Sequence, residues 1–356
     1  MKILHLYPKS DDMIAKHVSI LAEGLRNSAE IQVAESLSDF KERFRQMQPD
    51  IVHGHGCWQS GIIIAASIAR RHGTRFVLSP HGQLEPWEIK SNSRKGTRMA
   101  RCVERAYAVI AFGKMEQKYL QRLKWNPRIE VIRNSLITNS TTPQDMCMQT
   151  FAVYQKVMDT NVLELMDDKT RETLAVIIKA GITGDRRWID SQPSPLASPL
   201  STLNWRRLLI YAEHQNIRNY VDYGINILCL NALSLETTKI AAYFPEAYQK
   251  PKQLREIVGD YKGDETDYLV RMIRQIQKQP LLLHLIELTR ELYRDSVDDD
   301  RLLEALEEKG LTKYASRLMQ VLSEQTLLDE GYIPLQPTDD RGTRQIRNLI
   351  ANHLKI

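Results

Sequence analysis

The alternation of short apolar runs with helical patterns in residues 1–140 constrains the fold most strongly. Six runs have the length and composition of buried strands, near residues 3–7, 31–33, 50–53, 75–78, 108–112 and 129–132. Between these runs, apolar residues recur at the spacing of amphipathic helices. A repeated strand–helix order predicts a parallel sheet covered by helices. Residues 1–140 are therefore expected to form a Rossmann-like α/β domain.

The alternation stops after residue 140, and long helical patterns take over. Residues 141–356 are expected to form an all-α helical domain, so the chain has two domains. A Ser/Pro-rich stretch near 191–201 is predicted to be a loop or linker.

Charge is distributed unevenly between these two parts. Residues 1–140 carry 22 Lys and Arg against 13 Asp and Glu, whereas the remainder of the chain is net acidic. The basic part is the better candidate for binding a phosphate or an acidic membrane surface. It lacks aromatic residues interleaved with a basic face, so nucleic acid is not expected as a partner.

Four arginines after the fourth apolar run have the spacing of one helix face. They are Arg94, Arg98, Arg101 and Arg105. Such a face could contact anionic lipid headgroups or a phosphate-bearing acceptor. The alternative is a solvated surface without a ligand.

The cysteines lie far apart in the sequence and predict no disulfide framework. They are Cys57, Cys102, Cys147 and Cys229. No signal peptide is evident, since charged residues follow the first apolar run at once. The longest apolar helical run, residues 62–69, is too short to span a bilayer. A cytoplasmic protein is expected, with membrane contact limited to the periphery.

Polar residues follow several of the predicted strands and are the candidate site residues. Lys9 follows the first strand, His55 the third, His81 and Gly82 the fourth, and Asn134 the sixth. In open parallel sheets, ligands bind in the crevice outside the carboxyl ends of the strands. These residues are therefore expected to converge at one edge of the sheet. The alternative for His81 is a local role, hydrogen-bonding carbonyl groups of its own loop.

His53 and His55 also permit a metal site in principle. Residues two apart on a strand share a face, and Cys57 and His81 could complete a zinc ligand set. No carboxylate accompanies these residues, so hydrogen bonding and lining of the cleft are the expected roles. No metal or other cofactor is predicted.

Three segments resemble the amino-terminal domain of family 4 glycosyltransferases. Residues 49–56 read PDIVHGHG and are similar to the family pattern PDIVHxH. Residues 79–87 read SPHGQLEPW, followed by Lys90, and resemble the SPHGMLxPWALK segment of a bacterial branch. Residues 129–136 read IEVIRNSL and are similar to the VIPNGID segment.

The resemblance covers about residues 1–140 and implies the GT-B arrangement, in which two Rossmann-like domains face each other across a cleft. It implies transfer of a sugar from a nucleotide-sugar with retention, in cell-surface polysaccharide synthesis. His81 and Gly82 would line the cleft near the transferred sugar, with His81 as the catalytic candidate. Lys9, His55, Gly82 and Asn134 would bind substrate.

Departures from the family pattern leave two hypotheses open. The first loop, residues 8–13, lacks the usual glycine pair, and Ser135 replaces the glycine after Asn134. The glycine-rich donor-binding segment is absent, although Glu164 and Glu172 have the spacing of the family's paired glutamates. The chain could be a divergent transferase, an enzyme whose donor site lies in the helical part or on a partner. Alternatively, it could be a non-catalytic glycan-binding or scaffold protein that binds a protein partner through residues 141–356.

Overall fold

The computed structural model describes residues 1–187, 199–260, 263–294 and 296–356. The chain divides into two compact units, Met1–Met158 and Asp159–Ile356. Most of the predicted Ser/Pro-rich stretch near 191–201 lies outside the described residues.

The first unit contains the predicted parallel sheet of six strands. They are β1 (Lys2–Leu6), β2 (Glu30–Ala34), β3 (Ile51–His55), β4 (Arg75–Ser79), β5 (Ala108–Ala111) and β6 (Ile129–Val131). Their order is β2-β1-β3-β4-β5-β6, and each neighbouring pair is parallel. The chain passes from β1 to β2 on one side, then crosses back over β1 to β3 on the other side. The carboxyl ends of β1 and β3 therefore form the topological switch point, where this architecture places its ligand crevice.

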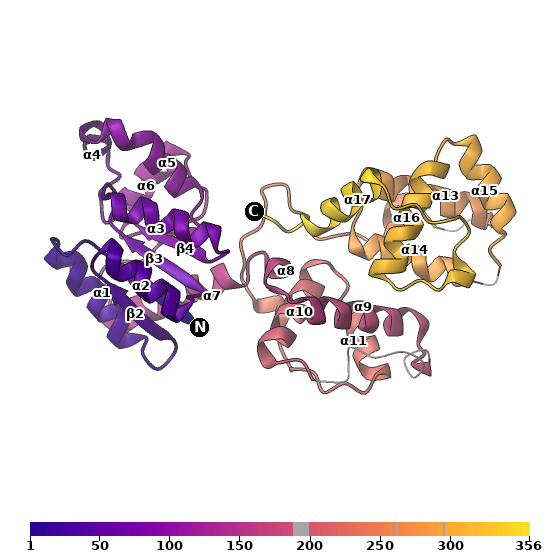
Figure 1. Cartoon of the computed structure of the whole chain (residues 1–356), viewed down its shortest axis with the longest axis horizontal. Coiled ribbons are helices and arrows are strands. Elements are labelled where there is room, and N and C mark those ends of the chain that lie inside the picture. The colour runs from indigo at the N-terminus through magenta and orange to yellow at the C-terminus, as the bar shows by residue number, and fades with distance from the viewer. Residues whose placement is uncertain (188–198, 261–262, 295) are drawn as a thin grey trace. The chain divides into compact units, whose positions relative to one another are not determined.

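Helices connect the strands and cover both faces of the sheet (Figure 1). They are α1 (Asp12–Gly24), α2 (Leu37–Met47), α3 (Ser60–Arg71), α4 (Pro86–Ser91), α5 (Gly96–Glu104) and α6 (Lys114–Leu123). Phe40 of α2, Ile62 of α3 and Met99 of α5 share one core with Leu4 and Leu6 of β1. Ile14 and Val18 of α1 pack with Tyr7, beyond the end of the same strand. Because side chains alternate along a strand, His5 faces the α1 side.

The predicted basic helix is not continuous. Arg94 lies in a short 3-10 turn (Ser93–Lys95), and α5 begins at Gly96. Arg98 and Arg101 lie on α5, and Arg105 caps its carboxyl end. All four arginines are exposed, while Met99, Cys102 and Val103 of α5 are buried.

Helix α7 (Pro143–Met158) belongs to the first unit, although the predicted boundary at residue 140 assigned it to the helical part. It packs against α1 at Gly24, where an added Cβ would lie 2.5 Å from Cys147 Sγ. Tyr154 of α7 is fully buried and contacts His53 of β3. Lys156 forms an ion pair of 2.6 Å with Glu130 of β6. The sheet is thus covered by a helix that follows its last strand.

The described residues of the second unit form helices and no strand, as expected. The helices are α8 (Val162–Leu165), α9 (Asp168–Thr183), α10 (Thr202–His214), α11 (Arg218–Ile227), α12 (Leu254–Val258), α13 (Glu265–Lys278), α14 (Leu282–Leu292), α15 (Asp299–Glu308), α16 (Thr312–Gln325) and α17 (Arg341–Ala351). They share one apolar core. Helices α9 and α11 meet backbone to backbone, because a Cβ on Gly181 or Gly224 would lie 2.1 Å from a carbonyl oxygen of the other helix.

Two further expectations concern thiols and membrane spans. Cys57, Cys102 and Cys147 are buried free thiols, and Cys229 is an exposed one. Within the described part of the chain, every helix is too short or too polar to cross a bilayer.

Candidate functional site

Five histidines gather at the carboxyl edge of the sheet, at the β1–β3 switch point. This histidine cluster consists of His5 on β1, His17 on α1, His53 and His55 on β3, and His81 just after β4. The parallel register places His5 beside His53, and His55 beside Ser79. Since His53 and His55 are two residues apart, both rings face the side of the sheet that α1 and α7 cover. Four of the five rings are buried, and His81 is partly exposed.

Hydrogen bonds connect the rings to one another and to their surroundings. His5 Nδ1 lies 2.9 Å from His55 Nε2, and His55 Nδ1 lies 3.1 Å from His81 Nε2. His53 Nδ1 contacts the Tyr154 hydroxyl at 2.6 Å, and its Nε2 contacts Ser79 Oγ at 2.8 Å. The expected hydrogen-bonding role of the His53–His55 pair is therefore confirmed.

Burial keeps these rings neutral. Desolvation lowers the pKa of His5 to about 3 and that of His17 to about 4. It also lowers the pKa values of His53, His55 and His81 well below the ordinary value, and neighbouring imidazoles add to the effect. A neutral imidazole has one N–H donor and one acceptor nitrogen. The site therefore presents neutral hydrogen-bonding groups rather than cations.

His17 links Asn134 to the cluster. It lies on the same face of α1 as Ile14, Val18 and Leu21, and its ring is 5.2 Å from that of His81, in an edge-to-face arrangement. A hydrogen bond from His17 to the side chain of Asn134 opposes the lowering of the His17 pKa. Asn134 is buried, and its Oδ1 also accepts the Leu136 N–H. Its side chain is thus fixed at the edge of the sheet.

Glu116 holds the turn that carries His81 and Gly82. Both turn residues have positive φ, 55° for His81 and 77° for Gly82. Positive φ is uncommon for residues other than glycine, although histidine adopts it more often than most. The Gly82 N–H donates to one oxygen of Glu116 at 2.7 Å, and the Phe112 N–H donates to the other at 2.7 Å. Burial raises the pKa of Glu116, and these two donors oppose the shift. A single buried carboxylate on α6 thus ties the His81 turn to the end of β5.

Gln83 closes the other side of the same loop. Its side-chain oxygen accepts the Cys57 N–H at 2.7 Å, and its carbonyl accepts the Trp58 indole N–H at 2.7 Å. The loops after β3 and β4 are therefore bonded to each other beside the cluster.

Among the predicted site residues, Lys9 lies apart from the others. Its side chain is 82% exposed, and its Nζ lies 3.6 Å from Oε2 of Glu35, in the loop after β2. His55, His81, Gly82 and Asn134 converge through the contacts described above.

Two groups of ring nitrogens lie close enough to hold a metal ion. They are those of His5, His53 and His55, and those of His17, His55 and His81, each within 4.8 Å of one another. Both nitrogens of His55 are already hydrogen-bonded to other rings, so an ion would replace those contacts. Cys57, the sequence candidate for a fourth ligand, belongs to neither group.

Sequence reasoning missed His5, His17, Glu116 and Tyr154. His17 follows the apolar spacing of α1, which predicts a core face and gives no sign of a site. His5 lies in the first strand pattern, and its alignment with His53 depends on a register that the sequence does not state. Glu116 lies on a polar helix, and Tyr154 on a helix assigned to the other domain.

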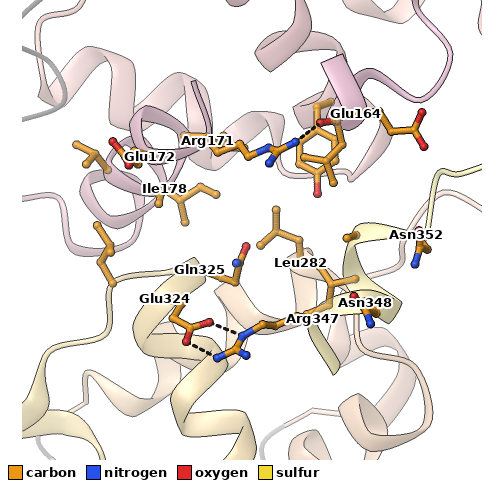
Figure 2. A pocket seen from close by; sticks show the side chains of 18 of the residues that line it. Glu164, Arg171, Glu172, Ile178, Leu282, Glu324, Gln325, Arg347, Asn348 and Asn352 are labelled. Carbon is orange, nitrogen blue, oxygen red and sulfur yellow. Dashed lines mark hydrogen bonds and ion pairs between the residues drawn. The ribbon is translucent and has the colours of Figure 1, made fainter. Parts of the chain in front are cut away.

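The second unit contains a cavity of about 650 Å³, between α8 and α9 on one side and α16 and α17 on the other (Figure 2). Leu163, Ile178, Leu282 and Ile350 are among its apolar lining residues. Glu164 and Glu172, which have the spacing of the family's paired glutamates, also line it.

Every cation among the described residues of this cavity already has an acidic partner. Arg347 pairs with both oxygens of Glu324, at 2.5 and 2.7 Å. Lys355 lies 3.1 Å from Glu164, and Arg171 lies 3.5 Å from Asp168. A nucleoside diphosphate needs cationic groups that are free to bind it. A diphosphate bound in this cavity would have to compete with these ion pairs.

Comparison with known families agrees with the geometry of the first unit. Residues 19–135 match the model of a glycosyl transferase 4-like domain. The match contains His53, His55, His81, Gly82, Glu116 and Asn134, and it ends before the second unit begins. It covers less than half of the chain, and His5, Lys9 and His17 precede it. No curated protein sequence matches the chain.

Neutral burial of the histidines predicts loss of stability in mild acid. A histidine in the unfolded chain gains a proton near pH ~6.5, whereas folded His17 stays neutral down to about pH 4. The unfolded state binds more protons between these two pH values. The contribution of neutral His17 to the free energy of unfolding is therefore complete above pH ~6.5 and is lost as the pH falls toward 4. We expect His17→Gln to reduce this dependence by ~2 kcal/mol in total between pH 7 and 5, measured by urea denaturation. His72→Gln, at an exposed position, is the control. If the free energy of unfolding of His17→Gln depended on pH as steeply as that of the unsubstituted protein, neutral burial of His17 would be contradicted.

Replacing Glu116 by Gln should loosen the His81 turn. The amide has one acceptor oxygen, so the Gly82 or the Phe112 N–H loses its partner, at a cost of ~1–3 kcal/mol. We expect faster hydrogen exchange at the Gly82 or the Phe112 amide, both measured by NMR. Glu104→Gln, at an exposed position on α5, is the matched control. Exchange at the Gly82 and Phe112 amides that is no faster in Glu116→Gln than in Glu104→Gln would show that Glu116 does not hold the turn.

Proposed function

We propose that the chain is a glycosyltransferase-like protein of cell-surface polysaccharide synthesis that transfers a sugar from a nucleotide-sugar with retention. The observation that carries this proposal is the position of the histidine cluster. It lies at the switch point of a glycosyl transferase 4-like domain, where parallel sheets bind their ligands. His81 is the partly exposed member of the cluster, and it is the one that a ligand can reach.

Each site residue has a proposed role. His81 hydrogen-bonds the transferred sugar or orients the acceptor, and Gly82 allows the ligand to approach the backbone. His55 positions His81 through the hydrogen bond between their rings, and Asn134 positions His17 beside His81 through a side-chain hydrogen bond. Lys9 is the exposed cation that could contact a phosphate from the loop after β1.

A second candidate function is non-catalytic glycan binding, with the helical unit docking onto a protein partner. It is favoured by the described residues of Asp159–Ile356, which form helices rather than a second Rossmann-like sheet. The paired cations of the cavity point the same way, because transfer requires stabilisation of the departing diphosphate.

Calorimetric titration of the full chain with UDP-, GDP- and dTDP-linked sugars separates these functions. The transferase proposal predicts saturable binding of one member, lost in His81→Ala and retained in His72→Ala, followed by turnover with retained anomeric configuration. His72 is an exposed histidine after α3 and serves as the matched control. Failure of every nucleotide-sugar to bind the intact chain would overturn a donor site in this protein and favour glycan binding.

The same proposal places the chain in the cytoplasm with peripheral membrane contact through Arg94, Arg98, Arg101 and Arg105. The nearby α4 carries Trp87, which is 56% exposed, and tryptophan is favoured at membrane interfaces. We expect co-sedimentation with phosphatidylglycerol vesicles that weakens with salt and is lost in the Arg98→Glu/Arg101→Glu variant. Arg70→Glu/Arg71→Glu on α3 is the control, and equal losses in both variants would contradict a specific contact.

A further inference from the structure

Three rings of the histidine cluster form a chain from the buried sheet to the exposed edge. His5 Nδ1 meets His55 Nε2 at 2.9 Å, and His55 Nδ1 meets His81 Nε2 at 3.1 Å. Both distances are those of hydrogen bonds, so each contact holds one proton between two nitrogens. The rings come from β1, from β3 and from the turn after β4.

Only two proton arrangements satisfy both contacts when all three rings are neutral. In the outward arrangement, His5 donates from Nδ1 to His55, His55 donates from Nδ1 to His81, and His81 carries its proton on Nδ1. In the inward arrangement, every proton moves to Nε2 and His81 donates toward His55. Burial keeps the rings neutral, since it lowers the pKa of each.

The buried end of the chain decides between these arrangements. His5 Nε2 is buried and has no hydrogen-bond partner among the described residues. The inward arrangement would place an N–H at this atom, and buried N–H groups without an acceptor are rare in proteins. The outward arrangement leaves an unpaired lone pair there, and unpaired buried acceptors are less rare in protein backbones than orphaned N–H donors, so we infer that His5 donates from Nδ1.

The exposed end of the chain is compatible with the same arrangement. His81 Nδ1 has no hydrogen-bond partner among the described residues, and the ring is partly exposed. In the outward arrangement its N–H is not used within the cluster and can donate to a ligand. Glu116 fixes the turn that contains His81 by accepting hydrogen bonds from the Gly82 and Phe112 N–H groups.

We propose that His5 and His55 are positioning residues that hold His81 as the Nδ1–H tautomer, so that the site binds its ligand through an oxygen acceptor. A sugar hydroxyl and a phosphate oxygen share this chemistry. The inference deepens the proposed function and rests on it for the identity of the ligand, whereas the tautomer is a property of the chain alone.

The tautomer is measured directly by long-range ¹H–¹⁵N NMR of the histidine-labelled full chain at neutral pH. His81→Gln identifies the His81 signals. We expect His81 to be predominantly protonated on Nδ1. A predominant Nε2–H form, or an even mixture, would overturn the proposal whether or not any variant folds.

Two substitutions of His5 test how the tautomer is set. An asparagine amide can donate from near the position of Nδ1, so His5→Asn should preserve the His81 tautomer. His5→Leu removes the donor and should abolish the preference of His81 for the Nδ1–H form. A general packing effect would instead change the His81 tautomer equally in both variants. His72→Leu is the control. If folded His5→Leu kept the His81 tautomer unchanged, the proposal would be overturned. Stoichiometric metal in the purified chain would also overturn it, because the ring nitrogens would then hold an ion.

Titration with UDP and with free glucose distinguishes the two sources of the acceptor oxygen. A shift of the His81 Nδ1–H signal with UDP but not with uridine identifies phosphate, and a shift with glucose identifies a sugar hydroxyl. Binding of a nucleotide-sugar that leaves this signal unchanged would overturn the oxygen contact. If His81 is the Nδ1–H tautomer but no nucleotide-sugar binds, the positioning role stands and the transferase function fails.

Discussion

The parallel register of β1, β3 and β4 is the constraint on which the site depends. It places His5 beside His53 and His55 beside Ser79, so imidazole rings meet on one buried face. Buried polar groups are costly unless they are hydrogen-bonded. Contacts with Ser79, Tyr154 and the other rings satisfy most of this requirement. A shift of the register by one residue would turn the same side chains to the opposite face of the sheet.

The cover over this face explains why the first unit extends to Met158. Helix α1 contributes His17, and α7 contributes the hydroxyl of Tyr154, so both helices take part in the polar core they cover. Close packing of Cys147 against Gly24 joins the two helices. Without α7, His53 would lose a buried hydrogen-bond partner. The domain therefore needs the segment after its last strand, beyond the residues that match the glycosyl transferase 4-like model.

Much of the fold could be predicted from the sequence, because strands buried on both faces appear as apolar runs and their alternation with helices admits few topologies. The convergence of His55, His81 and Asn134 followed from the rule that parallel strands end at one edge. His5, His17 and Glu116 could not be found in this way. Their roles depend on which strands are neighbours and on which helix covers them, and these are properties of the tertiary structure. The segment with the four arginines was predicted to be one helix, but a 3-10 turn precedes α5, which begins at Gly96. Helical periodicity alone does not reveal such a break.

We propose that ligand binds at the carboxyl edge of the sheet in the first unit. Hydrogen exchange of the full chain, followed by mass spectrometry with and without UDP-glucose, GDP-mannose and dTDP-glucose, tests it most directly. We expect the sugar nucleotide that binds to slow exchange in peptides that contain residues 53–57 and 79–86. Protection confined to residues 159–356, around the cavity between α9 and α17, would contradict it.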